Sequence, residues 1–208
     1  VVAEFHEFSA HSRRGLFRRA PGADWGGAPP PFKTWPGRSS LALPAPRLQG
    51  SPGADSDTTL DLPRLATLLF AAAGVNLQRG GIAFRTSPSS GALFASELYL
   101  RVNRVPGLAP GLYHYHGGEH RLVRLPGGSG ADTPAAAPDA ELVASAVFRR
   151  SGHKYRDRTY RYVLADLGHA LENLRLAALV STVQTHFVLR FDEARCAACS
   201  ICVSLCPA

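Results

Sequence analysis

The longest regularly patterned segment of the chain runs from residue 158 to 180 and reads RTYRYVLADLGHALENLRLAALV. Apolar side chains recur in it at steps of three and four residues, which places them on one face of an α-helix. A long helix with a single apolar stripe is stable only when another element covers that stripe. The rest of the chain must therefore supply a surface on which this helix packs.

The segments before the long helix predict an antiparallel sheet. Residues 96–105 (SELYLRVNRV) alternate with a period of two, and residues 111–116 (GLYHYH) follow after a turn rich in Gly and Pro. Residues 120–125 (HRLVRL) come after a second short turn, so the three segments form a plausible meander. On alternating strand positions, His114 and His116 point the same way, but two histidines without a third ligand make a weak metal site.

Three more segments complete the expected order of elements. Residues 61–74 predict a helix with Asp61 as its cap and Gly74 as its stop. Residues 139–150 predict a short helix, and residues 183–191 predict a strand because they alternate. Helices and strands in this order indicate an α+β fold rather than a regular βαβ series.

Composition divides the chain into three parts. Residues 1–60 are rich in Pro, Gly, Arg and Ser and indicate an extended N-terminal arm, whose aromatic residues, Phe32 and Trp35 among them, suggest that it lies across another surface. Residues 61–192 form the expected core, and residues 193–208 form a tail that is rich in Cys.

Charge and hydropathy exclude two classes of partner. The 208 residues have a net charge of +7, but no basic block or basic stripe marks a nucleic-acid interface. No apolar run approaches the ~20 residues that span a bilayer, and the start, VVAEFHEF, lacks the pattern of a signal peptide. We therefore expect a cytoplasmic protein that binds neither nucleic acid nor membrane.

Two stretches taken together resemble a known family. RTSPSSGALFASELYL (85–100) and HKYRDRTYRYVLADLGHALENLRLAA (153–178) are similar to the signatures of SagB-type dehydrogenases, a branch of the nitroreductase-like flavoproteins. The resemblance implies an FMN-binding α+β fold, with an antiparallel sheet flanked by helices, that forms a homodimer. It also implies that the chain stops short of the family's C-terminal part.

The same resemblance implies a type of chemistry. Relatives in this branch oxidise azoline rings of a modified peptide to azoles, with hydride transfer to flavin. Other relatives reduce nitro groups or quinones at the expense of NAD(P)H. The expected substrate is accordingly a small molecule or a modified peptide, and a truncated binding subunit without catalysis is a further alternative.

Residues near position 90 are the first candidates for flavin contact. Arg85 offers a planar fork suited to phosphate, while Ser89 and Ser90 offer hydroxyl groups. Gly91 allows the backbone to approach a ligand closely. The resemblance adds Asn173 on the long helix. However, residues 41–60, ahead of the first core helix, lack the Arg-Arg-Ser run with which many relatives grip the phosphate at that place in the chain.

Lys154 and Tyr155 are the candidate catalytic residues. Lys154 is one of two lysines in a chain with 23 Lys and Arg residues. The resemblance implies that this Lys-Tyr pair is the catalytic element. Lys154 would act either as a base or as a cation that stabilises developing negative charge.

All four cysteines lie in the tail RCAACSICVSLCPA. Cys196, Cys199, Cys202 and Cys206 have the spacing of a bacterial ferredoxin run, which indicates a [4Fe-4S] cluster and an electron-transfer role. The same spacing places the four side chains near one stripe of a helix, where Cys behaves as a small buried apolar residue. An artefact of the sequence at this end is the third alternative.

Overall fold

The computed structural model describes residues 2–9, 25–47, 57–127, 134 and 136–186. Its centre is a five-stranded antiparallel sheet with the strand order β1-β6-β5-β4-β7. The strands are β1 (Ser40–Ala42), β4 (Ser96–Val102), β5 (Gly111–His116), β6 (Arg121–Leu125) and β7 (Ala140–Ala146). A separate hairpin joins β2 (Val75–Arg79) to β3 (Ile82–Arg85).

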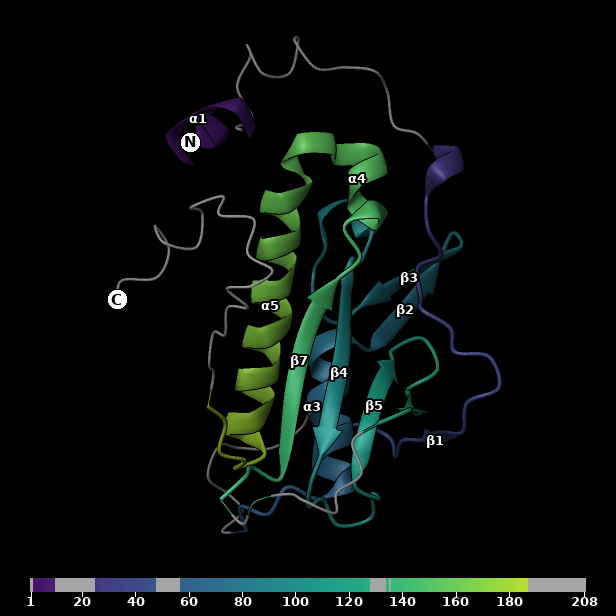
Figure 1. The fold of residues 1–208 in the computed structure, drawn as a ribbon, viewed down its shortest axis with the longest axis vertical. Helices are drawn as coiled ribbons and strands as arrows, with labels where there is room; N and C mark the ends of the chain where they lie inside the picture. The colour runs from purple at the N-terminus through teal and green to yellow at the C-terminus, as the bar shows by residue number, and fades with distance from the viewer. Residues whose placement is uncertain (1, 10–24, 48–56, 128–133, 135, 187–208) are drawn as a thin grey trace.

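Helices cover one face of the sheet, as Figure 1 shows. The two longest described helices, α3 (Leu62–Ala73) and α5 (Thr159–Val180), pack with β4 and β5 in one hydrophobic core. The shorter elements are α1 (Val2–Ser9), α4 (Arg149–Tyr155) and the 3-10 turns η1 (Trp25–Gly27), η2 (Ser90–Ala92) and η4 (Arg156–Arg158). The predicted α+β fold is therefore confirmed.

The core follows directly from strand alternation. Leu98 and Leu100 of β4 and Tyr113 and Tyr115 of β5 point toward the helices and are almost fully buried. Successive side chains of a strand point to opposite faces, so the intervening Tyr99 and His114 face the other side. The two are paired across the strands.

Residues 30–35 of the arm cover this second face. Trp35 meets His114 edge-on at a ring separation of 6.0 Å, and Lys33 donates to the Tyr99 hydroxyl at 2.7 Å. Phe32 lies 5.1 Å from the ring of His116. The expectation that the arm lies across a surface is confirmed for these residues, although the arm also contains a helix, α1.

The helix start at Asp61 agrees with the prediction. The Asp61 side chain accepts from the Arg64 N–H at 2.9 Å, and Pro63 occupies the first turn. The meander over residues 96–125 and the long helix over 158–180 are also confirmed, with boundaries shifted by at most a few residues.

One predicted helix is wrong. Residues 140–146 form β7, which pairs with β4 along its whole length, and helix α4 starts only at Arg149. The Ala-rich sequence favours a helix locally, but pairing with the open edge of β4 overrides that preference. The strand predicted over 183–191 is absent from residues 183–186, and its remainder lies outside the described residues.

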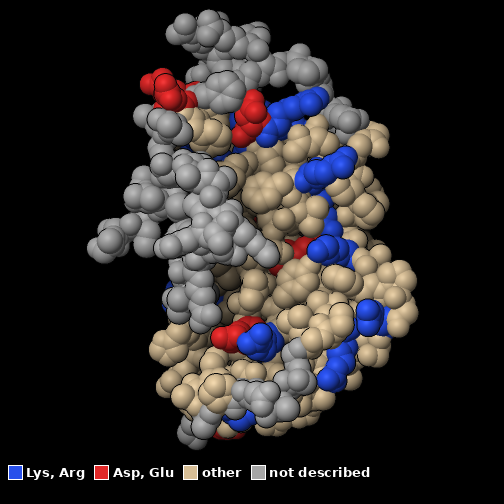
Figure 2. Space-filling view, viewed as in Figure 1, with Lys and Arg blue, Asp and Glu red and all other residues tan. Residues whose placement is uncertain are grey.

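Among the described residues, no helix combines the length and the hydropathy that crossing a membrane would require. Lys and Arg side chains lie at separate points over the face in Figure 2, with uncharged residues between them.

Candidate functional site

A strained turn precedes β4 and contains three of the predicted site residues. We call residues 89–92 the glycine turn. Gly91 has φ 66° and ψ 19°, and Ala92 (φ 55°) and Phe94 (φ 45°) also lie in the left-handed region. Such backbone is uncommon outside glycine and persists only when neighbouring contacts hold it. The turn is closed by a bond from the Ala92 N–H to the Ser89 carbonyl at 3.0 Å.

Lys154 and Tyr155 lie directly against Gly91, from helix α4. A Cβ added at Gly91 would clash with the Tyr155 hydroxyl oxygen and lie 2.9 Å from Nζ of Lys154. The Gly91 N–H donates to no described residue. The structure thus brings together two sequence-predicted groups that are more than 60 positions apart.

Neighbouring rings and cations fix the Tyr155 side chain. Its ring meets the ring of Tyr162 edge-on at 4.7 Å, and the Arg158 guanidinium lies 5.9 Å from the Tyr155 ring centre. Nζ of Lys154 lies 5.2 Å from the same centre. Two cations therefore lie beside one phenol ring, an arrangement that the negative face of the ring favours.

The hydroxyl groups of Ser89 and Ser90 are engaged by Asp166. Both donate to its carboxylate, Ser89 at 2.7 Å and Ser90 at 3.3 Å. Asp166 belongs to α5 and was not predicted as a site residue. The sequence offered one signal for it, a carboxylate among the apolar residues of the buried helix face. Because carboxylates are rarely buried without donors, such a position indicates a polar partner.

Arg85 points into the protein, where backbone carbonyls and aromatic rings surround its guanidinium. Its side chain is buried, and Nη1 and Nη2 donate to the carbonyls of Ser96 (2.7 Å) and Pro31 (3.0 Å). The rings of Phe32 and Phe94 flank the guanidinium at 5.2 and 5.4 Å. Burial lowers the pKa of Arg85 to about 10. Phosphate binding by Arg85 stays a prediction, and it would require these carbonyl contacts to break.

Asn173 lies on the same helix as Asp166. Its amide donates to the carbonyl of Thr86 at 3.3 Å, so it contacts the strand end that leads into the glycine turn. His169, one helical turn earlier, is exposed and bonds to the Ala165 carbonyl of its own helix. Neither contact tests whether Asn173 binds a cofactor.

A buried charged cluster lies beneath the arm, beside the glycine turn. Glu97 contacts His114 Nε2 at 2.6 Å and Arg150 Nη1 at 2.5 Å, and each of the three side chains is at most 4% exposed. Arg150 also donates to the carbonyls of Pro30 and Phe94. Burial alone would raise the pKa of Glu97, but the His114 and Arg150 contacts outweigh it and hold that pKa below its ordinary value.

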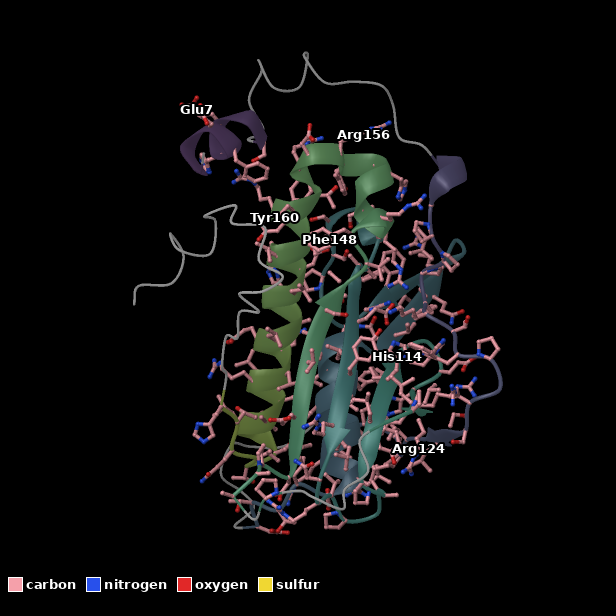
Figure 3. The ribbon with its side chains drawn as sticks, viewed as in Figure 1. Glu7, His114, Arg124, Phe148, Arg156 and Tyr160 are labelled. Atoms are coloured by element: carbon pink, nitrogen blue, oxygen red, sulfur yellow. The ribbon has the colours of Figure 1, made fainter. Side chains whose placement is uncertain are left out.

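A shallow, open pocket of about 320 Å³ is lined by residues of α4, η4 and the start of α5. The rings of Phe148 and Tyr160 stack at its wall, 5.9 Å apart, near the junction of α4 and α5 (Figure 3). Gly152 lines the cavity as well, whereas Lys154 and Tyr155 do not.

Metal ligation receives no support from the described part of the chain. No group of three or more His, Cys, Asp or Glu residues there could hold a metal ion. The predicted cluster ligands Cys196, Cys199, Cys202 and Cys206 lie outside the described residues.

Comparison with solved structures identifies the fold. A crystal structure from Anabaena variabilis, provisionally named a nitroreductase, matches with a TM-score of 0.66 and 29% identity over 85% of this chain. The chain has a nitroreductase-like fold. A second such structure, from Ralstonia eutropha, matches with a TM-score of 0.51 and 26% identity, over 74% of this chain and 78% of that one.

A curated sequence points the same way. A protein of Methanocaldococcus jannaschii, also provisionally named a nitroreductase, is 36% identical in an alignment of length 128 that covers 57% of this chain. The chain spans 63% of that protein and 38% of the Anabaena chain. No protein-family model matches the chain. The Escherichia coli microcin synthetase McbBCD complex matches with a TM-score of 0.48 and 22% identity, which is too weak to carry an argument.

Proposed function

We propose that the protein is an FMN-dependent oxidoreductase whose reaction takes place between the glycine turn and the Lys154–Tyr155 pair. The observation that carries this proposal is the approach of Lys154 Nζ and the Tyr155 hydroxyl to Gly91. A nitroreductase-like fold and relatives named as nitroreductases support an oxidoreductase.

The residues of the turn fit a bound flavin. Gly91 carries no side chain, is exposed, and keeps its N–H without a described partner, so its backbone is open to the polar edge of a planar ring. Ser90 and Asn173 hold the surrounding backbone in place. When bound, FMN supplies a two-electron acceptor or donor at this position.

The chain's own groups handle the proton. Oxidation of an azoline ring to an azole removes one hydride and one proton from the ring. The Tyr155 hydroxyl and the Lys154 amine lie side by side and are placed to take that proton, or to stabilise the negative charge that its loss creates. In the reverse direction, the same groups would deliver a proton to a reduced nitro group or quinone.

Azoline oxidation in a modified peptide is the substrate class that we propose first, and NAD(P)H-dependent reduction of a nitro compound or quinone is the alternative. Purified protein would be reconstituted with FMN and assayed with an azoline-containing peptide, and in parallel with NAD(P)H and a quinone. Turnover in only one assay assigns the substrate class. Failure to retain FMN would contradict the proposal as a whole.

Substitution of Lys154 tests the site. We expect Lys154→Ala to keep bound FMN and to lose about 10²–10⁴ in turnover, the range typical of a lost general acid or base. Lys154→Arg keeps the positive charge but cannot release a proton at neutral pH. An Arg variant as inactive as the Ala variant assigns a base, whereas partial activity assigns a charge-stabilising cation. Unchanged turnover in Lys154→Ala would sink the assignment.

A homodimer is part of the proposal. Leu164, Leu176 and Leu179 of α5 are 40%, 47% and 51% exposed, which leaves apolar surface on the outer side of the longest helix. A second copy of the chain would cover such surface. Light scattering after size-exclusion chromatography measures the oligomeric state, and a monomer at micromolar concentration would contradict this part.

The cluster predicted for the Cys tail remains a separate proposal. Iron and acid-labile sulfide, measured after anaerobic purification, decide it. Stoichiometric amounts of both would support an electron-transfer role at the tail, and their absence would leave the flavin proposal unaffected.

A further inference from the structure

Asp166 is a buried carboxylate on the apolar face of α5. It is 6% exposed, between the fully buried Val163 and Ala170 on the same helix face. Removing a carboxylate from water is costly unless donors satisfy it. It forms no ion pair with the described residues, so its donors must come from neutral groups.

Those donors all belong to the glycine turn. One carboxylate oxygen, Oδ2, accepts from the Ser89 hydroxyl at 2.7 Å. The other, Oδ1, accepts from the Ser90 N–H at 3.1 Å and from the Ser90 hydroxyl at 3.3 Å. The Ser89 oxygen in turn accepts from the Phe94 N–H at 2.9 Å. Asp166 therefore binds the N-terminal end of the strained segment directly and reaches Phe94 only through the Ser89 hydroxyl.

A rigid helix thus holds a turn that would not keep its shape alone. Gly91, Ala92 and Phe94 all have positive φ, and backbone of this kind persists only where its surroundings over-determine it. Lys154 and Tyr155 lie against Gly91 of the same turn, where an added Cβ would meet both side chains. The position of α5 consequently sets the distance between the turn and the catalytic pair.

We propose that Asp166 is a positioning residue that fixes the glycine turn against Lys154 and Tyr155. This inference rests on the proposed function, because it assigns Asp166 to the flavin side of the same site. Asp166 acts through the turn and touches neither substrate nor cofactor. A carboxylate suits this role because all three groups that it meets are donors and both of its oxygens accept.

The choice of variants follows from that donor set. Asp166→Ala removes both acceptors. Asp166→Asn retains one acceptor and turns an NH₂ group toward the other donors, so it restores only part of the hold. Glu172→Gln is the matched control, because Glu172 lies on the same helix but is exposed and pairs with Arg175.

The first readout needs no flavin. Amide hydrogen exchange of the apoprotein is measured over residues 89–94. We expect Asp166→Ala to exchange there at least about tenfold faster, the order of change expected when hydrogen bonds to a charged group are lost. Asp166→Asn should be intermediate, while Glu172→Gln should match the unmodified protein. Unchanged exchange in both Asp166 variants overturns the inference, and if Asp166→Ala does not fold, Asp166→Asn alone decides this step.

The second readout is the bound flavin. The FMN dissociation constant is measured by fluorescence quenching, and the visible circular dichroism of the complex reports the flavin environment. We expect an increase in Kd of about tenfold or more for Asp166→Ala, a smaller one for Asp166→Asn, and an altered dichroism spectrum in both. Faster exchange with an unchanged Kd and unchanged spectrum would overturn the positioning role.

The two readouts separate the two proposals. If the unmodified protein binds no FMN, the proposed function fails, while the exchange experiment still decides whether Asp166 holds the turn. If FMN binds and Asp166 variants behave like the Glu172 control, the inference about Asp166 fails and the proposed function stands.

Discussion

Replacement of Glu97 by Gln tests the buried charged cluster. Glu97 is 4% exposed and holds two partners, His114 Nε2 at 2.6 Å and Arg150 Nη1 at 2.5 Å. A hydrogen bond to a charged group contributes about 1.5–3 kcal/mol, and loss of one partner of a buried ion pair costs about 3–5 kcal/mol. Since Glu97→Gln leaves Arg150 buried without its carboxylate, we expect the free energy of unfolding to fall by about 3–5 kcal/mol.

Urea unfolding at pH 7 measures this loss. With a slope of about 2 kcal/mol per M, the midpoint should fall by roughly 1.5–2.5 M. Glu172→Gln serves as the control, because that side chain is 51% exposed and its ion pair with Arg175 is screened by solvent. The double variant Glu97→Met, Arg150→Met removes both charges and should recover part of the loss.

The pH dependence gives a second check on Glu97. Its pKa is lower in the folded protein than in the unfolded chain, so its contribution to stability is present at neutral pH. That contribution is complete above the pKa of Glu in the unfolded chain, about 4.3. It is lost as the pH falls from there through the lower pKa that Glu97 has in the folded protein. The difference between the unmodified protein and Glu97→Gln should therefore shrink on acidification. A loss below 1 kcal/mol at pH 7 would refute the reasoning.

Two glycine substitutions, with a third as a control, test the local geometry. Gly91→Ala should lower the free energy of unfolding by about 1–3 kcal/mol, because it strains a left-handed backbone and meets Tyr155 and Lys154. Gly80→Ala is its control, since Gly80 has φ 59° but no atom within 4 Å, and equal losses would show that the contact contributes nothing. Gly168 lies within α5, and an added Cβ there would have no atom within 4 Å. Because Ala favours a helix more than Gly does, Gly168→Ala should raise the free energy of unfolding by about 0.5–1 kcal/mol, measured by thermal unfolding. A lower value would contradict the open surroundings of this position.

The parts of the fold that local pattern determines were predictable. The 158–180 helix, the 61–74 helix and the meander each bury one face of a regular element, so their periodicity is visible in the sequence. Strand β7 was not, because Val143 is its one residue with a high strand preference, and the segment becomes a strand by pairing with β4.

The candidate site divides in the same way. Ser89, Gly91, Lys154 and Tyr155 were suggested by the resemblance, and the structure brings them into one place, although their roles stay predictions. Asp166 was missed because its donors lie 76 positions or more away in the chain. Its place on the apolar face of the helix indicates burial but does not identify those donors. The contacts of Arg85 with Ser96 and Pro31 were missed for the same reason.

The start of β4 connects the site to the charged cluster. The Phe94 N–H donates to the Ser89 hydroxyl of the glycine turn, while the Phe94 carbonyl accepts from Arg150. Arg150 is held by Glu97, and Arg85 is bonded to Ser96 between them. Because these bonds share one short stretch of backbone, the cluster fixes the C-terminal end of the turn while Asp166 fixes its N-terminal end. The arm contributes carbonyls to both arginines, which makes residues 30–31 part of the support of the site.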